Sequence, residues 1–311
     1  MKPLILCVTG PTACGKTAVS LALAAHLPIE IVCMDSMQIY RGMDIGTAKP
    51  DLSERAVCPH HMLDVAEPTQ EYSVAAYAGE AKARIAGILA RSHVPVLVGG
   101  TGMYLRALSL TINYGGTKGD AAIRRRYEQM AREKGNQSVH DVLRQKDPET
   151  AQRLHPNDLR RVVRALEVFE VTGTLMSAQK MPEYREGDYR ILPFVPDWDR
   201  PALYRRIDER VTKMFEQGLV SEVQALFASG VDKNAQSMQG LGYKELIPCL
   251  SGDMTLDEAA EMIRLRTRHY AKRQMTWLRG DERVLWMDAG AGKGSMVDTI
   301  LRKYEENADG Y

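Results

Sequence analysis

Lys16 and Thr17 are the first residues in the chain whose types and spacing indicate chemistry. They close residues 10–17, GPTACGKT, which have the Gly-x-x-x-x-Gly-Lys-Thr spacing of a phosphate-binding loop. The two glycines allow a tight turn in which successive N–H groups point at one anion, and the lysine adds a full positive charge. The threonine hydroxyl is a ligand for a Mg²⁺ ion that also binds phosphate oxygens. We therefore expect Mg²⁺ on Thr17 and a di- or triphosphate on Gly10, Pro11, Thr12, Ala13, Cys14, Gly15, Lys16 and Thr17.

Asp35 and Thr101 each follow a further apolar run, at residues 30–34 and 94–98. Ligands of open parallel sheets bind beyond the carboxyl ends of the strands, so both side chains are expected beside the phosphate-binding loop. Asp35 is a candidate general base or metal ligand, and the alternative is that it caps a helix or a turn. Thr101 is a candidate substrate contact, because no lysine follows its glycines as a second phosphate-binding loop would require.

Arg206 and Arg210 lie four residues apart in the helix that is predicted to start at Pro201. This spacing puts both guanidinium groups on one face, from which they could clamp a pyrophosphate. The alternative is that they pair with Asp208 or Glu209 on the surface. The spacing alone leaves both interpretations open.

A dense basic stripe occupies residues 263–279, where no acidic residue interrupts the arginines and lysines. Unneutralised positive charge with interleaved aromatic residues is typical of a surface that binds the phosphate backbone of a nucleic acid. The stripe consists of Arg264, Arg266, Arg268, Lys272, Arg273 and Arg279, with His269, Tyr270 and Trp277 between them.

The elements that must position these residues alternate between strand-like and helical patterns. This alternation predicts an α/β fold of the P-loop NTPase-like class, in which helices flank a parallel sheet. From 113 to 185 the strand pattern vanishes, so we expect a helical insertion domain, entered through the flexible residues 114–119, within a catalytic core of residues 1–112 and 186–311. The predicted strands are residues 4–9, 30–34, 94–98, 190–196 and 283–288.

The composition is that of an ordinary globular protein, with 44% hydrophobic and 26% charged residues among 311. No apolar run reaches membrane-spanning length, and the glycine loop interrupts the apolar start, so neither a membrane span nor a signal peptide is expected. The five cysteines lack the spacing of metal ligands or of a disulfide framework, which predicts reduced thiols and a cytoplasmic location. His60 and His61 are expected to be structural, because adjacent side chains point apart and no third ligand is near.

The segments that carry these residues resemble, in order and approximate spacing, those of the bacterial tRNA dimethylallyltransferase family, whose members are also called tRNA isopentenyltransferases. The resemblance extends from about residue 4 to about residue 288. Its most specific part is DSMQIYRGMDIGTAKP together with GGTGMY, since the glycine loop alone is shared with many kinases. The other matching segments are HPNDLRRVVRALEV, RIDERVTKMFEQGLVSEVQALFASG, GLGYKEL and RHYAKRQMTWLRG.

The resemblance implies transfer of a dimethylallyl group from dimethylallyl diphosphate to the exocyclic N6 amine of the adenosine just 3′ of the tRNA anticodon. An adenine amine is a poor nucleophile, so a base has to remove its proton as the new bond forms, and Asp35 is the expected base. The leaving diphosphate develops negative charge, which the loop, Lys16, Mg²⁺ and Arg206 or Arg210 would stabilise. Thr101 is expected to contact the target nucleotide. The predicted catalytic residues are therefore Asp35, Thr101 and Lys16.

The resemblance also implies a monomer that binds the anticodon stem-loop of tRNA. The target adenosine has to leave the stack of the anticodon loop, so the protein should hold the stem with basic residues and accept the flipped base. The residues expected to bind tRNA are Asp35, Ser36, Met37, Gln38, Thr101, Arg124, Arg160, Arg161, Val162, Val163, Arg164, Arg268 and Lys272.

Four other functions would account for parts of the sequence. A P-loop kinase of a small metabolite or nucleoside would use Asp35 to activate a hydroxyl, with the insertion as a lid. A nucleotide hydrolase is disfavoured, because the 94–98 strand lacks the terminal Asp that would hold Mg²⁺. A non-catalytic RNA-binding protein would need a vestigial loop, against which the intact Lys16 and Thr17 argue. A related enzyme that prenylates free adenine nucleotides differs only in its acceptor, and the basic stripe favours a polymeric one.

Overall fold

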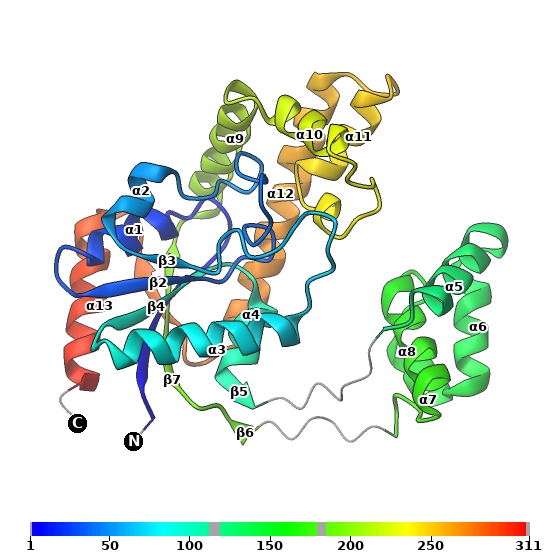
Figure 1. Cartoon of the computed structure of the whole chain (residues 1–311), viewed down its shortest axis with the longest axis horizontal. Helices are drawn as coiled ribbons and strands as arrows, with labels where there is room; N and C mark the ends of the chain where they lie inside the picture. Colours follow the sequence, from blue (N-terminus) through cyan, green and yellow to red (C-terminus); the bar gives the residue numbers. More distant parts are fainter. Residues whose placement is uncertain (1, 112–118, 179–184, 309–311) are drawn as a thin grey trace. The chain divides into compact units, whose positions relative to one another are not determined.

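The computed structural model describes residues 2–111, 119–178 and 185–308. Its chain forms two compact units (Figure 1). The first unit comprises Met1–Leu110 and Glu186–Tyr311, and the second comprises Thr111–Arg185. The sequence placed the corresponding boundaries at residues 112 and 185.

A six-stranded sheet with the order β3-β2-β4-β1-β7-β8 forms the centre of the first unit. Every described strand pair in it is parallel. The predicted α/β fold is therefore confirmed, and the short β3 is the strand of this sheet that the sequence did not predict. The strands are β1 (Leu4–Thr9), β2 (Ile29–Cys33), β3 (His60–His61), β4 (Val94–Gly99), β7 (Arg190–Asp197) and β8 (Leu285–Asp288).

Helices cover both faces of this sheet, which is why every residue of β1 is buried. Alternate side chains of β1 enter different clusters, with Ile5 and Cys7 in one and Leu6 and Val8 in the other. The first cluster packs against α3 (Val74–Ala90) and α4 (Gly102–Ser109), and the second packs against α1 (Lys16–Leu23) and α13 (Gly292–Ala308) (Figure 1).

A third cluster joins a group of helices to the chain that leaves β2. Ile39, Tyr40 and Met43 are fully buried in it beside apolar residues of these helices. The short α2 (Leu52–Val57) follows this chain. The helices and the one 3₁₀ turn of the group are α9 (Arg200–Glu216), α10 (Leu219–Ala228), η1 (Ser237–Gln239), α11 (Tyr243–Leu250) and α12 (Leu256–Arg279).

The second unit is helical and has its own apolar core, in which Val139, Val162 and Leu166 are buried. The strands β5 (Leu110–Thr111) and β6 (Arg185–Glu186) pair with each other. Of the predicted entry loop, residues 114–118 lie outside the described part of the chain. None of the described helices has the length and apolar character needed to cross a membrane. The helices of this unit are α5 (Ala121–Lys134), α6 (Asn136–Lys146), α7 (Pro148–Arg153) and α8 (Leu159–Thr172).

Candidate active site at the carboxyl edge of the sheet

The predicted phosphate-binding loop is the turn between β1 and α1. Its backbone has positive φ angles of 136° at Gly10, 64° at Ala13 and 96° at Gly15. A positive φ angle is strained for alanine, because its Cβ atom crowds the backbone, and strained residues of this kind concentrate at functional sites. The Nζ atom of Lys16 donates to the carbonyl oxygens of Gly10 (3.1 Å) and Pro11 (2.8 Å), which holds its charge over the loop. The loop therefore combines a cation with the N-terminus of α1, as an anion site requires.

Arg206 and Trp198 hold the outer side of this loop. The Nε atom of Arg206 donates to the carbonyl oxygen of Ala13 (2.8 Å), and the indole N–H of Trp198 donates to that of Cys14 (3.0 Å). The guanidinium group of Arg206 also stacks on the Trp198 ring, 4.6 Å from its centroid. Arg206 therefore lies at the loop, where it can supply a second positive charge to a bound diphosphate.

Gln274 of α12 joins the phosphate-binding loop to the glycine turn after β4. Its side-chain oxygen accepts the N–H of Thr12 (3.1 Å), and its amide nitrogen donates to the carbonyl oxygen of Gly100 (2.8 Å). One buried amide thus fixes the spacing between two turns that end neighbouring strands.

The ends of β2 and β4 approach each other so closely that only glycine fits at position 99. A Cβ atom on Gly99 would lie 2.1 Å from the carbonyl oxygen of Met34. The same carbonyl accepts the N–H of Thr101 (3.2 Å), and the Thr101 hydroxyl accepts the N–H of Ser36 (3.0 Å). Asp35 stands between Met34 and Ser36, so the structure brings Asp35 and Thr101 together.

Asp35 is half-buried, and its carboxylate forms the turn that follows β2. Its Oδ1 atom accepts the N–H groups of Met37 (2.9 Å) and Gln38 (3.4 Å). The capping role that the sequence left open is therefore correct for one oxygen. Among the described residues no hydrogen bond to the other oxygen, Oδ2, is present, so this atom can accept a proton from a ligand.

Among the described residues Arg210 forms no ion pair with Asp208 or Glu209, and Asp208 pairs with Arg268 instead. The guanidinium group of Arg210 donates to the carbonyl oxygen of Thr47 (3.1 Å). Burial lowers the pKa of Arg210, while the nearby carboxylate of Asp35 acts in the opposite direction. Asp35 and Arg210 are therefore close enough for their charges to interact.

The side chain of Gln38 is engaged within its own segment of chain. Its amide nitrogen donates to the carbonyl oxygens of Thr47 and Ala48, both at 3.1 Å, and its oxygen accepts the thiol of Cys33 (3.2 Å). The resemblance implies that Gln38 binds tRNA. In this structure its side chain bonds to other residues of the protein. It closes the loop between residues 38 and 48.

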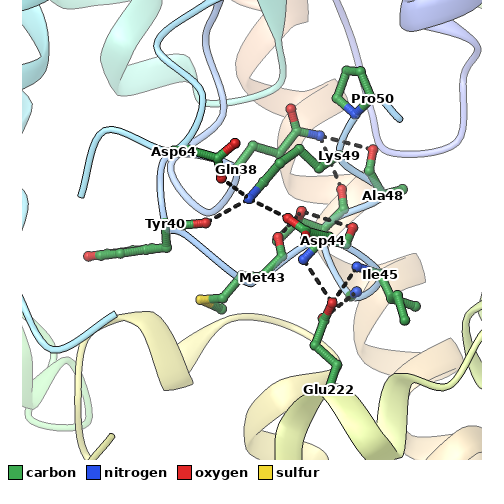
Figure 2. Close-up of polar contacts among 12 residues, drawn as sticks. Gln38, Tyr40, Met43, Asp44, Ile45, Ala48, Lys49, Pro50, Asp64 and Glu222 are labelled. Atoms are coloured by element: carbon green, nitrogen blue, oxygen red, sulfur yellow. Dashed lines mark hydrogen bonds and ion pairs between the residues drawn. The ribbon is translucent and has the colours of Figure 1, made fainter. Parts of the chain in front are cut away.

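Lys49 ties the same loop together from inside (Figure 2). Its side chain is fully buried, and its ammonium group contacts Asp44 and Asp64, both at 2.6 Å, and the carbonyl oxygen of Tyr40 at 2.7 Å. A buried lysine is stable only when its charge is paired in this way. We refer to residues 35–50, which these contacts fold into one body, as the 35–50 segment.

His60 and His61 have structural partners. The Nδ1 atom of His60 bonds to the carbonyl oxygen of Cys58 (2.8 Å), and the Nε2 atom of His61 bonds to Glu30 (2.6 Å). Throughout the described ranges no group of three or more His, Cys, Asp or Glu side chains is placed to hold a metal ion. All five cysteines are free thiols.

The chain is similar to known proteins over most of its length. A family model described as IPP transferase matches residues 38–281, and one described as isopentenyl transferase matches residues 3–61. The tRNA dimethylallyltransferase of Pelotomaculum thermopropionicum is 45% identical over 286 residues, which cover 92% of this chain and 91% of that protein. That of Carboxydothermus hydrogenoformans is 44% identical over 291 residues, or 93% of each chain. The chain belongs to the tRNA dimethylallyltransferase family.

Solved structures of this family have the same fold. The tRNA isopentenylpyrophosphate transferase of Bacillus halodurans superimposes with a TM-score of 0.72 at 37% identity, covering 99% of both chains. A eukaryotic dimethylallyltransferase acting on tRNA superimposes with a TM-score of 0.74 at 28% identity, covering 92% of this chain and 74% of that one. The P-loop NTPase-like fold predicted from the sequence is thereby confirmed.

In this family member the basic stripe of α12 is neutralised over its first half, which corrects the expectation from the sequence. The preceding turn of α12 supplies one acid, and the helices α11 and α9 supply the other two. The pairs are Arg264 with Glu261, Arg266 with Glu245 and Arg268 with Asp208. The exposed Lys272, Arg273 and Arg279 form no ion pair with any described residue, so the unneutralised charge of the stripe is at its C-terminal end.

The basic residues predicted in the insertion of this family member lie on α5 and α8. Arg124 (2.8 Å) and Arg164 (2.5 Å) both contact Glu167, which is buried, and Arg161 contacts Asp158 (3.3 Å). Burial alone would raise the pKa of Glu167, but hydrogen bonds from Arg164 and Arg124 outweigh it and lower that pKa. One buried carboxylate therefore orients two of the arginines expected to bind RNA.

The side chains of Val162 and Val163 are buried. The resemblance placed them with Arg160 among the residues that contact tRNA, but their side chains are 0% and 3% exposed in the core of the second unit. They pack α8 against its neighbours, and the exposed Arg160 is on the opposite side of the helix. The side chains of the two valines therefore support the helix that presents arginines.

Reasoning from the sequence missed Gln274 and also Glu222 of α10, whose carboxylate accepts the backbone N–H groups of residues 44–46. Gln274 continues the buried face of α12 formed by Thr267, Ala271 and Leu278, and a polar residue at a core position is a signal that could have found it. Glu222 gives no such signal, since acids are common in the first turn of any helix.

Proposed function

We propose that this protein transfers a dimethylallyl group from dimethylallyl diphosphate to N6 of the adenosine just 3′ of the anticodon of tRNA. The observation that carries the proposal is the position of the phosphate-binding loop, Asp35 and Thr101 at the ends of the neighbouring strands β1, β2 and β4. The relatives support the choice of substrates, since their names specify tRNA and the dimethylallyl group.

The donor diphosphate binds the loop between β1 and α1. Backbone N–H groups and the ammonium group of Lys16 surround its oxygens, and Arg206 approaches from the outer side of the loop. Charge develops on the diphosphate as the allylic C–O bond breaks. These fixed cations and dipoles stabilise that charge without having to reorganise.

A magnesium ion fits beside Thr17. The described residues provide no carboxylate cluster that would enclose a cation, and Thr17, half-buried in the first turn of α1, offers one hydroxyl. Mg²⁺ suits such a site because it keeps several water ligands and binds phosphate oxygens. Bound there, it would neutralise part of the charge of the diphosphate.

Asp35 and Thr101 act on the acceptor. The adenine N6 attacks the allylic carbon, the C–O bond to the diphosphate breaks, and the proton of N6 passes to the free Oδ2 atom of Asp35. The Thr101 hydroxyl is held by the N–H of Ser36, which leaves it aimed at the same space as the end of β2. Arg210 is near enough to Asp35 for the charge of the carboxylate to act on the buried guanidinium group.

The tRNA binds through cations on both units. On α12 the exposed Lys272, Arg273 and Arg279 are available for phosphates, and in the second unit Arg160 and Arg161 are exposed on α8. Arg124, Arg164 and Arg268 are held by carboxylates and would contribute orientation more than net charge. The monomeric state and the cytoplasmic location remain predictions from the sequence.

The test is a comparison of donors. Incubation with unmodified tRNA and either ¹⁴C-labelled dimethylallyl diphosphate or γ-³²P-labelled ATP should label the RNA only from the prenyl donor. Transfer of phosphate from ATP to a small acceptor, with no prenylation of RNA, would establish the kinase alternative instead. Label in free adenosine monophosphate but not in tRNA would identify the enzyme that acts on free nucleotides.

A further inference from the structure

Glu222 of α10 presents its carboxylate to three successive backbone N–H groups of the 35–50 segment (Figure 2). Its Oε2 atom accepts from Asp44 (2.9 Å) and Ile45 (2.7 Å), and its Oε1 atom accepts from Gly46 (3.1 Å). Successive N–H groups that converge in this way form a concave anion site, or nest. The side chain of a distant helix thus fills an anion site that the 35–50 segment builds.

The environment of Glu222 fixes its carboxylate in this position. The hydroxyl of Tyr243, a fully buried residue, donates to Oε1 (2.6 Å). Burial and the carboxylate of Glu222 both raise the pKa of Tyr243, so this hydroxyl remains a donor. Gly46 lies flat against the Tyr243 ring, where a Cβ atom would be 2.5 Å away, and the two residues hold the nest against α11.

The charged side chains near the nest pair with one another and not with Glu222. The carboxylate of Asp44 is paired with Lys49 (2.6 Å), and Lys49 is also paired with Asp64. Among the described residues no Lys, Arg or His forms an ion pair with Glu222. The backbone N–H groups are therefore the main partners of its charge, and hydrogen bonds to a charged group are the stronger kind.

The nest is two contacts away from the proposed base. Thr47 follows Gly46 in the chain, and its carbonyl oxygen accepts both the Gln38 side chain and Arg210. The backbone N–H of Gln38 in turn donates to Oδ1 of Asp35 (3.4 Å). Movement of residues 44–46 would therefore shift the residues that hold Asp35.

We propose that Glu222 is a positioning residue for the prenyl transfer. Its carboxylate serves as a built-in anion that holds the 35–50 segment in the conformation in which Asp35 and Ser36 meet the acceptor adenosine. This inference rests on the proposed function, and it assigns Glu222 to the acceptor side of the reaction. The donor side, which α9 and α12 hold through Arg206 and Gln274, does not depend on it.

The first experiment compares Glu222→Ala with Glu216→Ala, a control that removes an exposed glutamate near the end of α9. We expect Glu222→Ala to lower kcat/KM for tRNA by about 10- to 100-fold, because charged hydrogen bonds are lost from the segment that holds the base. The affinity for dimethylallyl diphosphate, measured by calorimetry, should stay within about twofold of wild type. The control should match wild type in both measurements.

Chemical rescue separates a positioning role from general destabilisation. Because the emptied nest of Glu222→Ala is still an anion site, added acetate should restore turnover, while chloride at equal ionic strength should not. Hydrogen exchange at the amides of Asp44, Ile45 and Gly46 should be faster in the variant and slow again with acetate. This exchange measurement does not depend on catalysis, so it tests the inference even if the proposed reaction is wrong.

Wild-type turnover with tRNA in Glu222→Ala, or unchanged exchange at the three amides, would overturn the proposal. An equal loss of diphosphate affinity and turnover would also overturn it, because Glu222 would then act on the whole site. If Glu222→Ala does not fold, Glu222→Gln decides the question, since its amide keeps one acceptor oxygen but loses the charge. It should show a smaller loss for tRNA with normal diphosphate affinity, and normal kinetics for tRNA would contradict the proposal.

Discussion

At the scale of single residues, Lys16 is the cation closest to the proposed diphosphate. Its Nζ atom already bonds to the carbonyl oxygens of Gly10 and Pro11, so little side-chain freedom remains to be lost on binding. Lys16→Ala should weaken the binding of dimethylallyl diphosphate by about 10- to 100-fold, the usual loss for a hydrogen bond to a charged group. Calorimetry with the isolated protein measures this directly. Wild-type affinity would remove Lys16 from the diphosphate site.

Gly99 is the residue that permits β2 and β4 to deliver Asp35 and Thr101 to one place. Gly99→Ala would put a Cβ atom 2.1 Å from the carbonyl oxygen of Met34, so the strand ends must separate. We expect a loss of about 1–3 kcal/mol in the free energy of unfolding, as for other overpacked sites, and a loss of activity.

The matched control for this variant is Gly79→Ala in α3, where a Cβ atom would meet nothing within 4 Å. It should be neutral or slightly stabilising, because alanine favours a helix over glycine. Thermal unfolding of the two variants makes the comparison, and equal midpoints would show that the close approach of β2 and β4 is not needed.

At the scale of elements, the cations of α12 that lack an ion-pair partner among the described residues lie at its C-terminal end. Lys272→Ala and Arg273→Ala should each reduce the slope of log affinity for tRNA against log salt by about one, because each removes a cation that has no protein partner. Arg268→Ala should change the slope less, since Asp208 already neutralises Arg268. Filter binding over a range of salt concentrations distinguishes them. Equal slopes in Lys272→Ala and wild type would show that this end of α12 does not face the RNA.

The junction of β2, β3 and α3 depends on Glu30, a buried carboxylate bonded to Arg91, His61 and His93. The hydrogen bond from Arg91 lowers the pKa of Glu30 from 4.5 to about 2. A depressed carboxyl pKa stabilises the folded state above pH 4.5 and loses this effect as the pH falls towards 2. Glu30→Gln should therefore lower the free energy of unfolding by about 1–3 kcal/mol at pH 7, the usual effect of losing hydrogen bonds between a buried group and charged partners.

Denaturant unfolding at several pH values tests this prediction. The difference between wild type and Glu30→Gln should shrink as the pH falls below 4.5, because only the wild type then loses the ionised carboxylate. A difference that does not vary with pH would mean that the packing of Glu30, and not its charge, stabilises the junction.

Local patterns predicted most elements of the sheet and the residues at the ends of its strands. Apolar runs and glycine spacing are local signals, so β1, β2, β4 and the phosphate-binding loop were found from the sequence. The acids that neutralise Arg266 and Arg268 lie at Glu245 and Asp208, far away in the sequence, and only the folded chain brings them together. The roles of Gln274 and Glu222 were not predicted, because their partners are backbone groups of turns that are distant in the sequence.

At the scale of the whole molecule, the two units contain different groups that the proposed function requires. The first unit contains the loop, Asp35 and Thr101, together with the helices that hold them. The second unit has a separate apolar core, and its Glu167 orients Arg124 and Arg164. On the proposed function, each unit can bind one part of the same tRNA while the reaction takes place in the first.

The most direct test of the proposed function measures product at one nucleotide with wild type and Asp35→Asn side by side. Asparagine keeps the Oδ1 acceptor that holds the N–H groups of Met37 and Gln38, so the turn should survive, but its amide cannot take the proton of N6. An anticodon stem-loop is incubated with each enzyme at saturating dimethylallyl diphosphate. The RNA is then digested, and the amount of N6-dimethylallyladenosine is measured against an authentic standard.

We predict that wild type modifies only the adenosine just 3′ of the anticodon, and that Asp35→Asn is slower by about 100-fold or more, the usual effect of losing a general base. Its affinity for the RNA should be unchanged, because the loss falls on the transition state. No prenylated adenosine from wild type would contradict the proposed function, and near-normal product from Asp35→Asn would contradict the assignment of Asp35 as the base.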